Sequence, residues 1–147
     1  MAKSMRLPII LLCLLLSGCI TLLAPYDDKF DQMATDLQRK VATHIEALDG
    51  SDMPDCLYAA HAAFYDAARV DVSALAVRAN AHALNAPTIA QIDSLKVSID
   101  DFEKIHQLAS RKPRCLGSDE LAPLRRAFDQ ILGAILKLEF AKKRGAA

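Results

Sequence analysis

The sequence has no stretch of useful length in which apolar and polar residues alternate with period two. Such alternation is typical of half-buried strands, so its absence argues against a β-sheet. The chain also has no internal repeat and no low-complexity segment. Its apolar residues instead recur at steps of three and four, which predicts an all-α protein.

Motifs of covalent and cofactor chemistry are missing as well. The chain has no nucleophile elbow, no phosphate-binding glycine loop and no pair of zinc-protease histidines. It also lacks the Cys-x-x-Cys-His motif of haem attachment. The adjacent acids Asp27-Asp28 and Asp100-Asp101 are typical of solvated faces or helix starts. We therefore expect a protein that is not an enzyme.

The first half of the chain contains two predicted helices. The first runs from Pro25 to Leu48 and is stopped by Asp49-Gly50-Ser51. Its apolar stripe consists of Tyr26, Phe30, Met33, Leu37, Val41, Ile45 and Leu48. The second begins between Ser51 and Pro54 and ends near Leu84, with a bend expected between Arg69 and Ser73. Its stripe consists of Leu57, His61, Phe64, Ala68, Val72 and Leu75.

Two further helices are predicted in the second half. Thr88 is the expected N-cap of the third, with Gln91 completing a capping box, and Arg111-Lys112-Pro113 ends it. Its inward face consists of Ile92, Leu95, Ile99, Phe102 and Ile105. The fourth begins after Gly117 and has the stripe Leu121, Leu124, Phe128, Ile131, Ile135 and Leu138. Short connections predict an antiparallel up-down-up-down four-helix bundle over residues 26–144, with a frayed tail at 145–147.

The N-terminal residues form a basic and then an apolar segment. Lys3 and Arg6 precede the apolar run Leu7–Leu16, which ends in Leu16-Ser17-Gly18-Cys19. This ending resembles the lipobox of bacterial lipoproteins, after a secretory signal peptide. The resemblance implies that residues 1–18 are removed by cleavage between Gly18 and Cys19. Cys19 would then carry a diacylglyceryl thioether and an N-acyl chain such as palmitate, which together anchor a protein stably.

The residues after Cys19 bear on where the anchored domain lies. Residues 19–25 form a short apolar tether, and residue 20 is Ile rather than the aspartate that retains such lipoproteins in the inner membrane. The resemblance thus implies a Gram-negative outer-membrane lipoprotein that faces the periplasm. The alternative is an uncleaved membrane-spanning anchor, because apolar residues continue to Ala24. Pro8 and Ser17-Gly18 argue against that alternative.

The charge of the chain constrains its partners. Lys3 and Arg6 are the only basic residues before Cys19, so 16 of the 18 basic residues remain after cleavage, against 18 acidic ones. Such a balance gives no general attraction to nucleic acid. The expected partners are the membrane, through the lipid, and another envelope protein or peptidoglycan.

Two cysteines remain after Cys13 leaves with the signal peptide and Cys19 receives lipid. Cys56 lies at the start of the second predicted helix and Cys115 in the connection between the third and fourth. An up-down bundle brings both to one end, so a disulfide is expected in an oxidising periplasm. It would stabilise the domain by about 4 kcal/mol. Two free thiols or a metal pair are the alternatives.

Three histidines are brought towards that same end by the topology. His44, His61 and His106 lie on or beside apolar stripes, and imidazole is a natural ligand of zinc, copper and nickel. Glu103 precedes His106 by three residues, the Glu-x-x-His spacing of di-iron bundles, but such sites use two of these segments. The alternative is that the histidines are hydrogen-bonded boundary residues, and no cofactor beyond the lipid is then expected.

Two basic clusters are candidates for contacts with anions. Arg111, Lys112 and Arg114 are expected near the acids Asp49, Asp52 and Asp55, which would balance their charge. Lys142, Lys143 and Arg144 are expected near the lipid anchor, where they would touch anionic headgroups or complement the helix dipole. Neither cluster identifies a partner.

Overall fold

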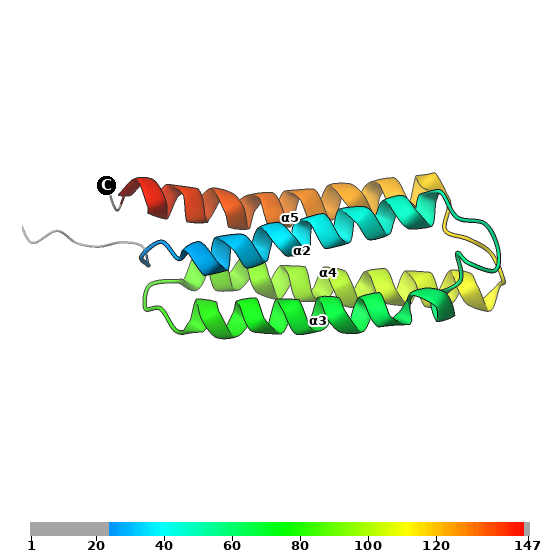
Figure 1. Cartoon of the computed structure of the whole chain (residues 1–147), viewed down its shortest axis with the longest axis horizontal. Coiled ribbons are helices and arrows are strands. Elements are labelled where there is room, and N and C mark those ends of the chain that lie inside the picture. Colours follow the sequence, from blue (N-terminus) through cyan, green and yellow to red (C-terminus); the bar gives the residue numbers. More distant parts are fainter. Residues whose placement is uncertain (1–23, 146–147) are drawn as a thin grey trace, which may run out of the picture.

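The computed structural model describes residues 24–145 as four antiparallel helices (Figure 1). The helices are α2 (Asp28–Asp49), α3 (Tyr58–Asn80), α4 (Ala86–Arg111) and α5 (Ser118–Gly145). Each helix packs against the next in the chain, and α5 packs against α2, which closes the ring. The predicted all-α four-helix bundle is therefore confirmed. The predictions for residues 1–18, for Cys19, for residues 20–23 of the tether and for Ala146–Ala147 lie outside the described residues.

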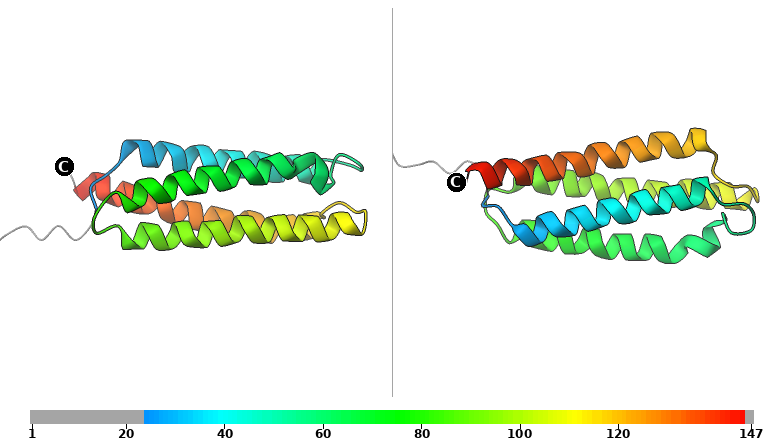
Figure 2. Two further views of the ribbon diagram at one scale, coloured as in Figure 1. Left: turned by 90° about the horizontal axis from the view of Figure 1, so that it is seen from below. Right: turned by 45° about the horizontal axis from the view of Figure 1, so that its top comes forward.

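The bundle has two ends with different contents, and Figure 2 shows both from two further sides. The start of α2, the α3–α4 connection and the end of α5 share one end, which we call the terminal end. The α2–α3 and α4–α5 connections share the other, which contains the Cys56–Cys115 disulfide and which we call the disulfide end.

Helix α2 begins three residues later than predicted, because Asp27 caps it. The Asp27 carboxylate accepts hydrogen bonds from the backbone amides of Lys29 at 3.0 Å and Phe30 at 3.2 Å. These amides have no partner inside the helix, so an aspartate at this position stabilises the helix start. From Phe30 onwards, the residues of the predicted stripe are buried as expected, except Met33, which is half-buried.

Helix α3 is shorter than predicted at both ends and shows no break between Arg69 and Ser73. Residues 52–57 form turns instead, with the Cys56 amide donating to the Asp52 carbonyl at 3.1 Å. Its buried face is also rotated about the helix axis relative to the predicted stripe. Tyr65 is fully buried, while His61 and Phe64 are half-buried.

Helix α4 corrects two predictions. It begins at Ala86, so Thr88 lies inside the helix and the predicted capping box is wrong. The buried face continues from Phe102 through His106 to Ala109, in alternating steps of four and three, and Ile105 is exposed. The prediction that Ile105 lies on the inward face is therefore wrong, whereas the predicted inward position of His106 is confirmed.

Of the predicted stripe of helix α5, Leu121, Phe128 and Ile135 are buried, and Leu124 is half-buried and packs against the core. Leu132, Glu139 and Lys142 are buried, whereas Ile131 and Leu138 are half-buried. The buried face thus passes through two charged residues that the pattern assigned to the surface. Gly145, expected in the frayed tail, belongs to the helix.

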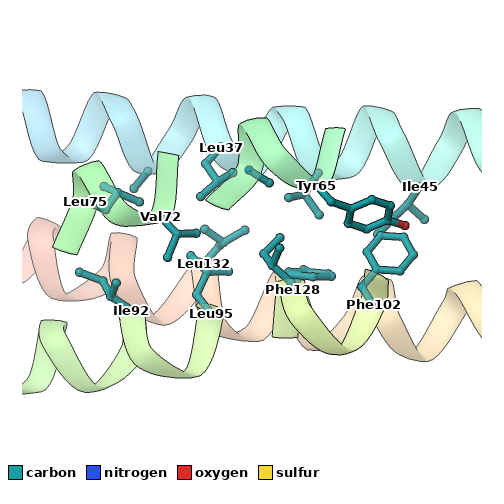
Figure 3. Close-up of a cluster of buried hydrophobic side chains, with 14 of the residues drawn as sticks. Leu37, Ile45, Tyr65, Val72, Leu75, Ile92, Leu95, Phe102, Phe128 and Leu132 are labelled. Carbon is teal, nitrogen blue, oxygen red and sulfur yellow. The ribbon is translucent and has the colours of Figure 1, made fainter. Parts of the chain in front are cut away.

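The core runs the length of the bundle and changes character along it (Figure 3). Aromatic rings gather towards the disulfide end, where Tyr65 and Phe128 each lie within 6 Å of the ring of Phe102, measured between ring centroids. Aliphatic side chains fill the rest, including Leu37, Val72, Leu75, Ile92, Leu95 and Leu132. The aromatic part lies beside the three histidines.

Candidate functional site

The predicted disulfide is confirmed and closes one end of the bundle. Cys56 and Cys115 are bonded, with their Cα atoms 5.4 Å apart across 59 residues of sequence. Cys56 is buried and Cys115 is half-buried. The bond joins the two connections that meet there and thereby fixes the backbone around the histidines.

His106 is fully buried, and both of its ring nitrogens are hydrogen-bonded. Nε2 lies 2.9 Å from the Cys56 carbonyl oxygen, and Nδ1 lies 2.8 Å from the Tyr65 hydroxyl. A carbonyl only accepts, so Nε2 carries the proton and Nδ1 accepts from Tyr65. Burial lowers the pKa of His106 and raises the pKa of Tyr65, so both side chains stay neutral.

His44 is buried beside this pair but makes a different set of contacts. Its ring stacks on Phe64 with centroids 3.5 Å apart, and its Nε2 has no hydrogen-bond partner in residues 24–145. Burial, with smaller contributions from His61 and His106, lowers the pKa of His44 to about 3. A neutral imidazole with a free nitrogen is the form that binds metal ions.

His61 and Glu103 complete the set of predicted ligands. The His61 ring centroid lies 5.0 Å from that of His44 and 5.6 Å from that of His106, and its Nε2 donates to the Asp55 carbonyl at 2.7 Å. Glu103 accepts from the Tyr58 hydroxyl at 2.7 Å and from the Arg69 guanidinium at 2.5 Å. The bundle gathers the three histidines, whereas the Glu103 carboxylate is bound to Arg69 and Tyr58.

The described residues contain no group of three or more His, Cys, Asp or Glu side chains placed to hold a metal ion. His106 uses both nitrogens, so a ligand at this end must rely on His44 and His61 or displace existing hydrogen bonds. The cluster is organised chiefly as a hydrogen-bonded and stacked aromatic group.

The terminal end contains a buried polar network that sequence reasoning missed. The Lys142 ammonium donates to Asn85 Oδ1 at 2.7 Å, to Thr88 Oγ1 at 3.0 Å and to Glu139 Oε1 at 2.5 Å. All four side chains are buried. Lys142 is therefore not free for lipid headgroups, and that prediction is wrong for this residue. The spacing of Lys142 in the sequence could have indicated its burial, because Ile135, Glu139 and Lys142 continue the buried steps of four and three.

A second ion pair binds the start of α2 to the end of α3. Arg78 donates to the Asp27 carboxylate through Nε at 2.5 Å and through Nη2 at 2.9 Å. Burial opposes ionisation of Asp27, but the bonds from Arg78 and from the Phe30 amide outweigh it and lower the pKa of Asp27 to about 2. The chain is thus held firmly where it enters the bundle.

The remaining basic residues of the two clusters are exposed. Arg114 pairs with Glu120, at 2.6 and 2.8 Å, rather than with Asp49, Asp52 or Asp55. Arg111 and Lys112 are exposed in the same region. Lys143 and Arg144 are exposed at the terminal end and lie over the rings of Tyr26 and Phe140, respectively.

The bundle surface also carries large apolar side chains. Two valines on α3 are the most exposed of them, Val77 at 71% and Val70 at 67%. Val97 and Leu108 on α4 and Phe140 on α5 are also more than half exposed. None of the described helices has an apolar stretch long enough to cross a bilayer. These side chains are therefore candidate contacts on the surface of the bundle.

Comparisons of the chain with protein-family models, with curated proteins and with solved structures gave no match.

Proposed function

We propose that this protein is a lipid-anchored helical bundle of the Gram-negative envelope, with a structural or protein-interaction role rather than an enzymatic one. The lipobox-like residues Leu16-Ser17-Gly18-Cys19 support lipidation at Cys19 after removal of residues 1–18. Ile20 favours the outer membrane, facing the periplasm. The disulfide fits an oxidising compartment.

The observation that carries the proposal is how soon the chain enters the packed bundle after Cys19. Ala24 is only 3% exposed, and Asp27 is already bound to Arg78. The segment from Cys19 to Ala24 spans at most about 17 Å when fully extended. A lipid on Cys19 would thus hold the folded domain close to the membrane surface.

The arrangement of polar groups supports a binding role over a catalytic one. The buried imidazole of His106, the carboxylate of Glu103 and the ammonium of Lys142 are each bound to partners within the chain. Catalytic acids and bases need access to substrate. The exposed aliphatic side chains, in contrast, are available for contact with another protein of the envelope.

Labelling with a palmitate analogue tests the anchor. The full-length chain in a Gram-negative host should incorporate the label and lose residues 1–18, and Cys19→Ser should abolish both. Cys13→Ser is the matched control, because its cysteine lies in the removed segment, and it should keep the label. Equal labelling of Cys19→Ser and the parent chain would overturn the proposal.

The interaction role needs a separate experiment. A photo-crosslinking residue at the exposed Lys112 position of the disulfide end should capture a defined envelope protein or a peptidoglycan fragment in cells. The same residue at Lys137 on the exposed side of α5 serves as the comparison position. Failure to capture any envelope component from several exposed positions would count against an interaction role.

A metal- or small-ligand-binding bundle is the second candidate, and one observation favours it. The His44 Nε2 atom is buried and has no hydrogen-bond partner within residues 24–145. The centroid of the His44 ring lies 5.0 Å from that of the His61 ring. Metal analysis of the full chain, with His44→Phe and His106→Ala as variants, tests it. The candidate predicts stoichiometric zinc, copper or nickel that His44→Phe loses while its stacking on Phe64 is kept. Absence of metal at stoichiometric level would exclude a metal site.

A further inference from the structure

The terminal end of the bundle presents a leucine to solvent. Leu84 lies in the connection between α3 and α4, where its side chain is 58% exposed and its backbone has a φ of 62°. This left-handed conformation favours glycine, because the Cβ atom of any other residue crowds the backbone there. A leucine at this position neither eases the turn nor adds to the core. Its side chain is therefore a candidate for contact with something outside the bundle.

The next residue fixes Leu84 in this exposed position. Asn85 is buried, its Nδ2 donates to the Ala79 carbonyl at 2.8 Å, and its Oδ1 accepts from the Lys142 ammonium at 2.7 Å. The connection is thus bound both to the end of α3 and to α5. Because its backbone is already held, Leu84 loses little conformational freedom when it makes a contact, and such preorganisation favours binding.

Phe140 is a second large apolar side chain exposed at this end, on the last part of α5 (Figure 1). It is 57% exposed, and the Arg144 guanidinium lies 4.8 Å from its ring centroid. The Lys143 ammonium lies 5.2 Å from the ring centroid of half-buried Tyr26. Apolar and aromatic side chains beside basic ones are typical of surfaces that bind at the membrane–water interface.

The charges left exposed at this end are mostly basic. Three of its carboxylates are bound within the chain, namely Asp27 to Arg78, Asp31 to the Tyr26 hydroxyl and Glu139 to Lys142. Asp28 is exposed, but so are Lys29, Lys143 and Arg144. Neither Lys143 nor Arg144 forms an ion pair with a carboxylate of residues 24–145. This excess of positive charge is complementary to anionic headgroups.

The segment that leads to the lipid leaves the bundle at the same end. Ala24 is only 3% exposed, and the segment from Cys19 to Ala24 spans at most about 17 Å. With a lipid on Cys19, the bilayer surface therefore lies within that distance of the terminal end. This step rests on the proposed function, and it determines which surface Leu84 and Phe140 face.

We propose that the terminal end docks on the anionic membrane surface that holds the lipid anchor. Leu84 and Phe140 enter the headgroup layer, and Lys143 and Arg144 contact the lipid phosphates. Phe140 lies about 8 Å from Gly145 along α5, close to the thickness of one headgroup layer. Phe140 therefore enters that layer when the end of α5 reaches the hydrocarbon boundary.

The position of Arg144 suits this depth. Its guanidinium lies over the ring of Phe140, one turn back along α5, and so points away from the end of the helix. Long basic side chains near a bilayer extend in this way to keep their charge at the level of the phosphates. The apolar part of Arg144 then covers the same boundary as Phe140.

Docking by the terminal end makes the bundle stand on the membrane. Helix α5 has 28 residues and is about 42 Å long. The disulfide end, with its three histidines, is then held about 40 Å from the lipid surface. The buried bonds of Lys142 and Asn85 acquire a second role, because they fix the connection that presents Leu84 to the membrane.

Fluorescence of a single tryptophan tests the docking, because the chain contains no tryptophan of its own. The full-length chain, matured in a Gram-negative host, is reconstituted into vesicles of phosphatidylethanolamine and phosphatidylglycerol, and its flotation with the vesicles is measured. Emission of Phe140→Trp should shift to shorter wavelength and be quenched by lipids brominated on their acyl chains. Val97→Trp and Leu108→Trp, at exposed positions along α4, should show neither effect.

Substitutions at the surface itself refine the test, with Phe140→Trp as the reporter. Leu84→Gly suits the left-handed backbone, so the fold is kept, and it should lower the ratio of docked to undocked bundles roughly fivefold. Val97→Ala, an exposed apolar position away from this end, is the control and should not change the ratio. Lys143→Gln and Arg144→Gln should each lower it by about fivefold, and vesicles of phosphatidylcholine alone should weaken docking similarly.

The outcomes separate this inference from the anchor. A chain that floats with the vesicles while the emission of Phe140→Trp stays unchanged would overturn the docking and leave the anchor standing. A chain that does not float would overturn the anchor and the docking with it. Equal quenching of Phe140→Trp, Val97→Trp and Leu108→Trp would show a bundle that lies along the membrane and would overturn docking by the terminal end.

Discussion

The two ends of the bundle are closed by different chemistry. At the disulfide end, a covalent bond and neutral hydrogen bonds hold the connections together, with His106 between Tyr65 and the Cys56 carbonyl. At the terminal end, charged groups do so, through the buried Glu139–Lys142 pair and the Asp27–Arg78 pair. Both sets of contacts join chain segments that are far apart in sequence.

The two ends therefore depend on opposite protonation states of their buried groups. The disulfide end is stable while its buried imidazoles are neutral, whereas the terminal end is stable while the Asp27 carboxylate is ionised. Lowering the pH therefore weakens the two ends in different ranges, which run from 6.5 to about 3 for His44 and from 3.8 to about 2 for Asp27. Substitutions also act differently, since a charge left alone in the interior costs more than a neutral group left alone.

Breaking the buried Glu139–Lys142 pair at the terminal end should have the largest effect on the free energy of unfolding. Lys142→Met leaves the Glu139 carboxylate buried without its cation and should lower the free energy of unfolding by about 3–5 kcal/mol. Denaturant unfolding measures this. Lys143→Met, at an exposed neighbour, should change it by less than about 0.5 kcal/mol. Equal effects of the two variants would contradict a stabilising role for the pair.

Removing both partners together sharpens that result. Glu139→Leu with Lys142→Met replaces the charges by apolar groups of similar size and should recover most of the stability lost in Lys142→Met. Failure to recover would point to the bonds with Asn85 and Thr88 as the important ones.

Removing the disulfide should have the next largest effect on the free energy of unfolding. Cys56→Ser with Cys115→Ser should lower the free energy of unfolding by about 2–4 kcal/mol, because the unfolded chain regains the freedom that the crosslink removes. Reductant should destabilise the parent chain similarly and leave the double variant unchanged. Two free thiols, titrated in unreduced and unfolded protein, would contradict the bond.

Mild acid should weaken the disulfide end first. Unfolded chains protonate His44 below pH 6.5, while the folded protein does so only near pH 3. The free energy of unfolding therefore falls as the pH drops through this range, by about 2 kcal/mol at pH 5. Hydrogen exchange should show protection lost near the disulfide before the terminal end. His44→Phe should flatten this pH dependence, and an unchanged slope would refute the assignment.

Removing the cap at the terminal end should have the smallest effect. Asp27→Ala loses the bonds to the α2 amides and the half-exposed ion pair with Arg78, and it should lower the free energy of unfolding by about 1–2 kcal/mol at pH 7. The folded pKa of about 2 lies below the unfolded 3.8, so the wild-type advantage shrinks as the pH falls from 3.8 towards 2. Asp28→Ala, an exposed neighbour, is the control. A constant difference between pH 7 and pH 2 would contradict the ionic role.

Several features could be predicted because they depend on local pattern or simple topology. Stripes such as Phe30, Leu37 and Val41 report a helical face directly, since one face of a helix is set by its period. An up-down order then brings Cys56 and Cys115 to one end without any further information. The gathering of His44, His61 and His106 follows from the same order.

Other features could not be predicted because they depend on which neighbour each side chain meets. Thr88 was interpreted as a cap because of Gln91, but its hydroxyl accepts a hydrogen bond from Lys142, 54 residues away. Glu103 was grouped with His106 by spacing, but Arg69 and Tyr58 hold its carboxylate. The spacing of residues shows which of them share a face of one helix. It does not show which side chain of another helix each of them contacts.

The sequence pattern is sufficient to predict four amphipathic helices with two cysteines at a common end. The packing of the four helices is needed to show that Lys142 is buried, that His106 is neutral between two hydrogen-bond partners and that α3 keeps a second apolar face in solvent. The physical reason is that burial of a charge or exposure of a valine depends on the positions of the other helices. The helical period of one segment carries no information about where the other helices lie.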